Sequence, residues 1–268
     1  MLRSLFTGIS GLRAHQQMLD VTANNIANVN TVGYKSGATS FEETLSQTLG
    51  GASAATATAG GTNPIQVGLG VKLAATSANL TEGSAQTTGN KTDLMINGDG
   101  YFVIKNAGTT EYTRAGAFHL DAVGHLVTPD GSILQDVTGA DVDLSALQVP
   151  GAYKDWSIGP NGDVNAVNAA GVTTTLATIG LATFANPAGL TRVGDTAFVA
   201  SASSGVATVV APATVGIGNL STGLLEMSNV DLSTELTNLM ISERGFQANS
   251  RVISTSDEVL QTLVNLKN

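Results

Sequence analysis

The chain has 268 residues, of which 12% are charged and none is Cys. Its 12 basic and 21 acidic residues give a net charge of −9, which argues against a nucleic-acid partner because such a partner requires a concentrated basic face. The lack of Cys excludes a disulfide framework, thiolate metal ligands and a Cys nucleophile. No run of Lys or Arg indicates attachment to an anionic membrane, and no apolar stretch reaches the roughly 20 residues that span a bilayer.

Residues 1–34 predict a long amphipathic helix at the N-terminal end. Apolar side chains recur there at heptad spacing, at Leu2, Leu5, Ile9, Leu12, Leu19 and Ile26. Such a stripe is typical of helices that pack lengthwise on other helices. The stretch is not a convincing signal peptide, since Ser, Thr, Gly and Arg13 interrupt the apolar run and no clean cleavage site follows.

The end of this helix is rich in Asn, in the stretch NNIANVNTVGYK at 24–35. Asn28, Asn30 and Gly33 predict the helix stop, because Asn and Gly tolerate the left-handed backbone conformation. Asn24 and Asn25 come before that stop, where a cap has no use for them. We therefore predict that Asn24 and Asn25 form specific hydrogen bonds to another helix.

Residues 35–72 are expected to form a connecting segment. The stretch LGGASAATATAGGTN at 49–63 is dense in Gly and Ala, which marks a flexible or extended linker more often than a binding loop. From 73 to 223 short apolar runs alternate with turn signals at Asn97–Gly100, Asp121–Gly124, Pro129–Gly131 and Pro160–Gly162. Strands with turns every 8–12 residues or so predict a mainly antiparallel β domain.

Residues 224–268 predict a second long helix. Its apolar stripe comprises Leu232, Leu236, Leu239, Phe246, Ile253, Leu260 and Leu263, and Asp231 and Ser233 are both plausible N-caps. Two long helices of this kind either pack on the core of their own chain or pack on each other and on neighbouring copies. The narrow stripes and the weakly charged opposite faces favour the second arrangement.

The sequence offers no residues for catalysis or for a cofactor. His119 and His125 flank one turn and His15 lies in the first helix, but no third ligand accompanies them, and a zinc site needs three or four. No dinucleotide fingerprint, P-loop or nucleophile elbow is present, and Asp141 and Asp143 alone do not make a catalytic pair. We therefore predict a protein that is not an enzyme and binds no cofactor or metal.

Three blocks of the chain carry a family resemblance. The first, LRSLFTGISGLRAHQQMLDVTANNIANVNTVGYK, contains the motif residues Asn25, Asn28, Asn30, Thr31, Gly33, Tyr34 and Lys35. The second runs from DLMINGDGYFVI through YTRAGAFHLDAVGHLVTPDG, and the third is LEMSNVDLSTELTNLMISERGFQANSRVISTSDEVLQTLVNL. Together they resemble the bacterial flagellar rod and hook protein family, over both ends and most of the middle.

The resemblance implies an α+β fold and a structural role. In the family the Asn-rich stretch joins the terminal helix to the rest of the subunit, so we expect Asn25 and Asn28 to form hydrogen bonds within the helical layer and Asn30 and Gly33 to end the helix. The N- and C-terminal helices, 1–34 and 224–268, would form a discontinuous coiled-coil domain lining a hollow helical polymer, with 73–223 as an outer, mainly antiparallel β domain. Its implied partners are copies of itself, the hook cap protein, the distal rod protein, the hook–filament junction protein and the flagellar type III export apparatus. The implied location is extracellular, in the flagellum, after export without a cleaved signal peptide.

Within the family, the segment RGFQANS at 244–250 looks like the hook version, and LEMSNVDLS at 225–233 also resembles it. We therefore interpret the chain as a short hook subunit, whose curved tube would act as a universal joint that transmits torque from rod to filament. A length of 268 residues is also near that of a distal rod protein, which is the alternative. A third interpretation is a secreted β-domain adhesin with helical oligomerisation arms, which would form discrete oligomers. In the monomer we expect the terminal helices to be largely disordered and to order on incorporation.

Overall fold

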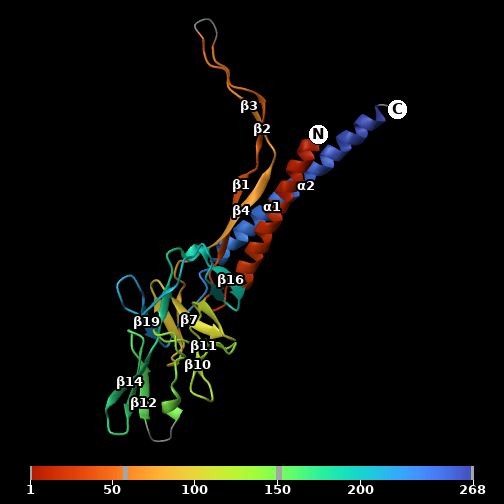
Figure 1. The fold of residues 1–268 in the computed structure, drawn as a ribbon. Helices are drawn as coiled ribbons and strands as arrows, with labels where there is room; N and C mark the ends of the chain where they lie inside the picture. Colours follow the sequence, from red (N-terminus) through yellow and green to blue (C-terminus); the bar gives the residue numbers. More distant parts are fainter. Residues whose placement is uncertain (1, 57–59, 149–152, 267–268) are drawn as a thin grey trace. The chain divides into compact units, whose positions relative to one another are not determined.

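The computed structural model describes residues 2–56, 60–148 and 153–266. They form two compact units (Figure 1). The helical unit comprises residues 1–27, 37–78 and 231–268, and the β unit comprises residues 28–36 and 79–230. The boundaries differ from the expected ranges, because residues 28–34 and 224–230 lie in the β unit and residues 37–78 lie with the helices.

The helical unit is built on two long helices, α1 (Leu2–Ala27) and α2 (Leu232–Asn265). They run antiparallel side by side, with the start of α1 beside the end of α2 (Figure 1). Asp231 is the N-cap of α2, and its side chain accepts hydrogen bonds from the backbone N–H groups of Ser233 and Thr234. The sequence proposed Asp231 and Ser233 as N-caps, and the structure uses Asp231.

Residues 37–50 and 65–78, on either side of the Gly- and Ala-rich stretch, pair as a two-stranded β ribbon (Figure 1). Strand β1 (Gly37–Glu43) pairs with β4 (Val71–Ala78), and β2 (Ser46–Gly50) pairs with β3 (Ile65–Gly68), both antiparallel. A further bridge joins Ser53 to Thr62. Most of the Gly- and Ala-rich stretch at 49–63 lies outside these strands, since β2 ends at Gly50 and β3 begins at Ile65, and residues 57–59 lie outside the described part of the chain. The expectation of a flexible or extended linker at 49–63 therefore stays a prediction.

The β unit is antiparallel in every described strand pair, as the turn spacing predicts. Its largest sheet has the order β16 (Thr191–Gly194), β17 (Ala197–Val199), β8 (Thr109–Thr113), β7 (Tyr101–Asn106), β11 (Ile133–Leu134), β10 (Leu126–Val127) and β9 (His119–Leu120). Strand β15 (Leu181–Thr183) pairs with both β7 and β18 (Thr208–Val210). Smaller sheets are β12 (Tyr153–Ile158), β13 (Asp163–Asn168) and β14 (Thr173–Thr178); β6 (Leu94–Asn97) with β19 (Asn219–Thr222); and β5 (Ala85–Thr87) with β20 (Leu224–Glu226).

The hydrophobic core of the β unit joins these sheets. Leu94, Phe102, Leu126, Leu181 and Leu220, from five different strands, are all nearly or fully buried in one cluster. The predicted turn at 97–100 is present, but it does not close a hairpin. The strands on either side of it, β6 and β7, pair with β19 and β8 respectively, so the turn carries the chain from one sheet to another.

Candidate functional site: exposed helical faces and a buried charge cluster

Many large apolar side chains on the two helices are exposed. Phe6 on α1 is 67% exposed, and Met240 and Val264 on α2 are 56% and 63% exposed. The other exposed members are Ile9, Leu232, Leu236, Ile241, Phe246, Val252, Val259 and Leu263. Apolar surface on this scale is typical of a face that another protein covers.

The predicted apolar stripes divide into two groups in the structure. Ile9, Leu232, Leu236, Phe246 and Leu263 are exposed. Leu5, Leu12, Leu19, Ile26, Leu239, Ile253 and Leu260 are half-buried, and the side chain of Leu2 lies outside the described residues. The heptad pattern therefore identifies an apolar face on each helix. The contact between α1 and α2 covers only part of these apolar faces.

Small and polar residues form the contact between α1 and α2, which we call the helix seam. A Cβ added to Gly8 would meet Ile253, one added to Gly11 would meet Asn249, and one added to Gly245 would meet His15. The buried side chains of the helices are likewise small or polar, namely Ala14, Thr22, Asn25 and Ser242. A search for apolar periodicity misses these residues, because the seam depends on the close approach of two backbones.

Asn25 links three elements of the helical unit. Its amide nitrogen donates to Glu235 Oε1 of α2 at 2.9 Å and to the backbone carbonyl of Gly37 at 2.8 Å. Its amide oxygen accepts from the backbone N–H of Gly37 at 2.9 Å, and the residue is 1% exposed. The prediction that an amide before the helix end bonds to another helix is confirmed for Asn25.

The remaining Asn and Gly residues of the motif act after the helix, which ends at Ala27 and not near residue 34 as expected. Asn28 lies in the following turn, where its side-chain oxygen accepts a hydrogen bond from Thr31 Oγ1 at 3.0 Å, and Asn30 is exposed. Gly33 has a φ of 69°, and a Cβ there would lie 2.4 Å from the backbone nitrogen of Ala115. Gly33 thus permits a close approach inside the β unit and does not stop the helix.

The last motif residue, Lys35, is part of a buried charge cluster with Glu226 and Arg114. Lys35 Nζ lies 2.5 Å from Glu226 Oε1, and the two side chains are 1% and 0% exposed. Lys35 also donates to the carbonyl of Thr81 at 2.8 Å, and Glu226 Oε1 accepts from the backbone N–H of Gly83 at 2.9 Å. Arg114 Nη1 lies 3.5 Å from Glu226 Oε2.

The charge cluster holds the segment after α1 in the β unit. Burial lowers the pKa of Lys35 below its usual value, and the hydrogen bond to Glu226 acts in the opposite direction. Arg192 adds to this anchor, since its Nη2 donates to the carbonyl of Lys35 at 2.5 Å and its guanidinium lies 5.3 Å from the ring centroid of Tyr34. Sequence reasoning identified Tyr34 and Lys35, but no local signal points to their partners, which lie far along the chain.

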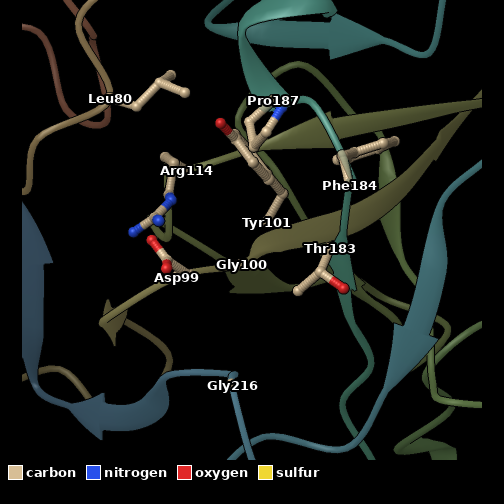
Figure 2. A pocket seen from close by; sticks show the side chains of 9 residues that line it. All are labelled: Leu80, Asp99, Gly100, Tyr101, Arg114, Thr183, Phe184, Pro187 and Gly216. Carbon is tan, nitrogen blue, oxygen red and sulfur yellow. The ribbon is translucent and has the colours of Figure 1, made fainter. Parts of the chain in front are cut away.

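Arg114 also lines a small hollow of about 180 Å³, shown in Figure 2. Its guanidinium lies 5.3 Å from the ring centroid of Tyr101, and the ring of Tyr101 contacts that of Phe184 edge-on, with 5.9 Å between centroids. Burial raises the pKa of Tyr101, so its phenol is a proton donor at neutral pH. Among the described residues there is no group of three or more His, Cys, Asp or Glu that would suit a metal ion, and no helix has the length and apolar content to cross a membrane.

Comparison with known proteins shows which family has these helices and this β unit. Over its whole length the chain is 47% identical to the flagellar basal-body rod protein FlgG of Bacillus subtilis, and that protein is also covered completely. It belongs to the flagellar rod and hook protein family. Family models match at three places: the flagella basal body rod protein at 5–35, the flagellar hook protein FlgE/F/G D1 domain at 95–166, and the flagellar basal body rod FlgEFG protein C-terminal region at 221–266.

Two further members of the flagellar rod and hook family show how the chain relates to each branch. The FlgG rod protein of Caulobacter vibrioides is 36% identical over 270 positions, covering 99% of this chain and all of that one. The hook protein FlgE of Borreliella burgdorferi is 28% identical over 442 positions, with both chains fully covered. Because this chain has 268 residues, the hook alignment needs long gaps and the rod alignments do not.

Proposed function

We propose that this protein is a rod subunit of the bacterial flagellum, a structural protein that polymerises with copies of itself into a straight, hollow axial tube. The observation that carries the proposal is the alignment of the whole chain, almost without gaps, to a rod protein at 47% identity. The interpretation as a hook subunit rests on two much shorter stretches, RGFQANS at 244–250 and LEMSNVDLS at 225–233. The hook therefore becomes the second candidate.

The structure supports self-assembly through the helices. The helix seam pairs α1 with α2 through small and polar side chains, which leaves apolar residues such as Phe6, Met240 and Val264 exposed. A chain with such faces gains free energy when neighbouring copies cover them, at about 25 cal/mol for each Å² of apolar surface removed from water. The helices would line the tube, the β unit would form its outer wall, and the helices would order fully on incorporation.

The remaining partners follow from a place in the flagellar axis. Export by the flagellar type III apparatus, followed by assembly outside the cytoplasmic membrane, is part of this proposal. As a rod subunit it would contact the hook at one end of the rod. As a hook subunit it would instead contact the rod, the hook cap and the hook–filament junction protein.

Electron microscopy of the full-length protein after salt-induced polymerisation tests the proposal. Straight hollow tubes are the expected result. Curved tubes would contradict the rod assignment and support the hook. Discrete oligomers would contradict both and favour the adhesin with helical arms. A variant with the exposed Phe6 and Met240 both replaced by Ser is expected to stay monomeric while its β unit remains folded, because these side chains are exposed in the single chain.

A further inference from the structure

Arg114 of the β unit is a buried cation whose hydrogen-bonding capacity is mostly unused. Its side chain is only 5% exposed, and its ion pair with Glu226 is a long contact of 3.5 Å from Nη1 to Oε2. Within the described part of the chain, Nε is buried without a hydrogen-bond partner and Nη2 donates no hydrogen bond. A buried donor without a partner is unfavourable, so the guanidinium is stabilised by any further acceptor that reaches it.

The unused edge of Arg114 has the geometry of a fork. Nε and Nη2 lie on one edge of the planar guanidinium, where their N–H groups match the two oxygens of a carboxylate. The other positions are taken, because Nη1 contacts Glu226 and the ring of Tyr101 lies 5.3 Å from Cζ. Arg114 also lines the hollow of about 180 Å³ in Figure 2, which has room for several water molecules at ~30 Å³ each. A small planar acid therefore fits the space that the hollow offers to Arg114.

The charges of the charge cluster also favour an anion. Lys35 and Arg114 contribute two buried cations to it, and Glu226 contributes one buried anion. Glu82, which acts on Lys35, and Asp99, which lines the hollow, are both exposed and form no ion pair among the described residues. An excess of buried positive charge is costly unless an anion compensates it. A carboxylate bound to Arg114 would supply that compensation.

We propose that the hollow beside Arg114 is a binding site for a carboxylate group, which the Nε–Nη2 edge of Arg114 holds. Thr183 adds a hydroxyl group to the lining, and Leu80, Phe184 and Pro187 supply apolar walls, which suit a carboxylate on a short aliphatic stem. A free carboxylate and an Asp or Glu side chain of a neighbouring copy share this chemistry. The site does not depend on the proposed function, because residues of one β unit form all of its described lining.

Thermal unfolding of the full-length protein, followed by the fluorescence of Trp156, tests the site with acetate as the probe. In acetate at about 30 times a millimolar dissociation constant, the melting temperature should be roughly 4–8 °C higher than in chloride at the same ionic strength. Acetamide, the neutral analogue, should cause no such rise. Arg114→Lys keeps the charge but lacks the fork, so it should lose the acetate response, whereas the matched control Arg192→Lys should keep it. The part of the rise that Arg114→Lys abolishes is the part due to the site.

Asp99 supplies a second test that leaves the charge cluster intact. Because Asp99 is exposed and lines the hollow, Asp99→Asn removes a negative charge beside the site and should tighten acetate binding about threefold or more. Binding of acetate in Asp99→Asn alone would overturn the proposal, since Asp99 would then be the natural occupant of the fork. Equal melting temperatures in acetate and chloride would also overturn it, since water would then satisfy the fork.

The Nε–H resonance of Arg114 in NMR spectra gives a direct readout that does not require a folded Arg114 variant. It should shift with acetate and not with acetamide, and an unchanged resonance would refute the site.

Polymerisation distinguishes the two sources of the carboxylate. If a neighbouring copy supplies it, acetate should raise the critical concentration for polymerisation, measured by sedimentation, and the polymer should not bind acetate. If free carboxylates are the ligand, acetate should bind the polymer and the single chain equally. Either result supports the site and identifies its ligand. Failure of the protein to polymerise would contradict the proposed function and not the site, because the acetate measurements use the single chain.

Discussion

The Lys35–Glu226 pair provides the sharpest test of what stabilises the β unit. Lys35→Met keeps most of the side-chain volume and removes the charge. It leaves the fully buried Glu226 carboxylate with the backbone N–H of Gly83 and with Arg114 at 3.5 Å. Breaking a buried ion pair from one side typically costs 3–5 kcal/mol or so, because an uncompensated charge remains inside the protein. We expect Lys35→Met to destabilise the β unit by about that amount.

Lys91→Met is the matched control. Lys91 Nζ also lies 2.5 Å from its partner, Asp155, but these two side chains are 56% and 68% exposed. Water and salt screen such a pair, so its removal should change stability little. The two substitutions remove the same group from pairs of equal length, and the pairs differ in burial.

Urea unfolding measures both variants. Trp156 is the only Trp of the chain and packs against the core of the β unit, so its fluorescence reports the unfolding of that unit, with circular dichroism as a second probe. For a unit of this size, 3–5 kcal/mol corresponds to a fall in melting temperature of very roughly 6–20 °C. Equal losses in the two variants would refute the reasoning, because burial would then not determine the worth of the pair.

Two further predictions concern the helices. A Cβ at Gly245 would lie 2.4 Å from the His15 ring, whereas at Gly8 its nearest neighbour would lie 3.1 Å away. We therefore expect Gly245→Ala to raise the critical concentration for polymerisation, since overpacking costs about 1–3 kcal/mol. Gly8→Ala should be neutral or slightly favourable, since the gain in helix propensity is about 1 kcal/mol. A larger loss of assembly in Gly8→Ala than in Gly245→Ala would contradict the close approach at Gly245. The backbone N–H of Ser233 holds the pKa of Asp231 below 3.8, so the stability that this cap gives α2 is present above 3.8 and is lost as the pH falls through the folded-state pKa. Circular dichroism during acid titration of the polymer should show this loss, and Asp231→Asn, which also caps helices, should remove that part of the pH dependence.

Local pattern determined much of this protein. Heptad recurrence located both long helices, Asp231 was one of two proposed caps, and the regular turns indicated an antiparallel β domain. Asn25 was singled out because an amide before a helix end has no capping role, and it does bond to the second helix. These features depend on residues a few positions apart, so the sequence displays them directly.

Tertiary packing decided the features that join distant segments. The ribbon of residues 37–50 and 65–78 exists because strands on either side of a Gly- and Ala-rich stretch pair with each other. Lys35 meets Glu226 only in the folded β unit, where segments far apart in the sequence enclose the pair. Composition and periodicity do not encode which distant groups meet. Burial and partner choice, which set the energy of a charge or a strand pair, therefore had to come from the structure.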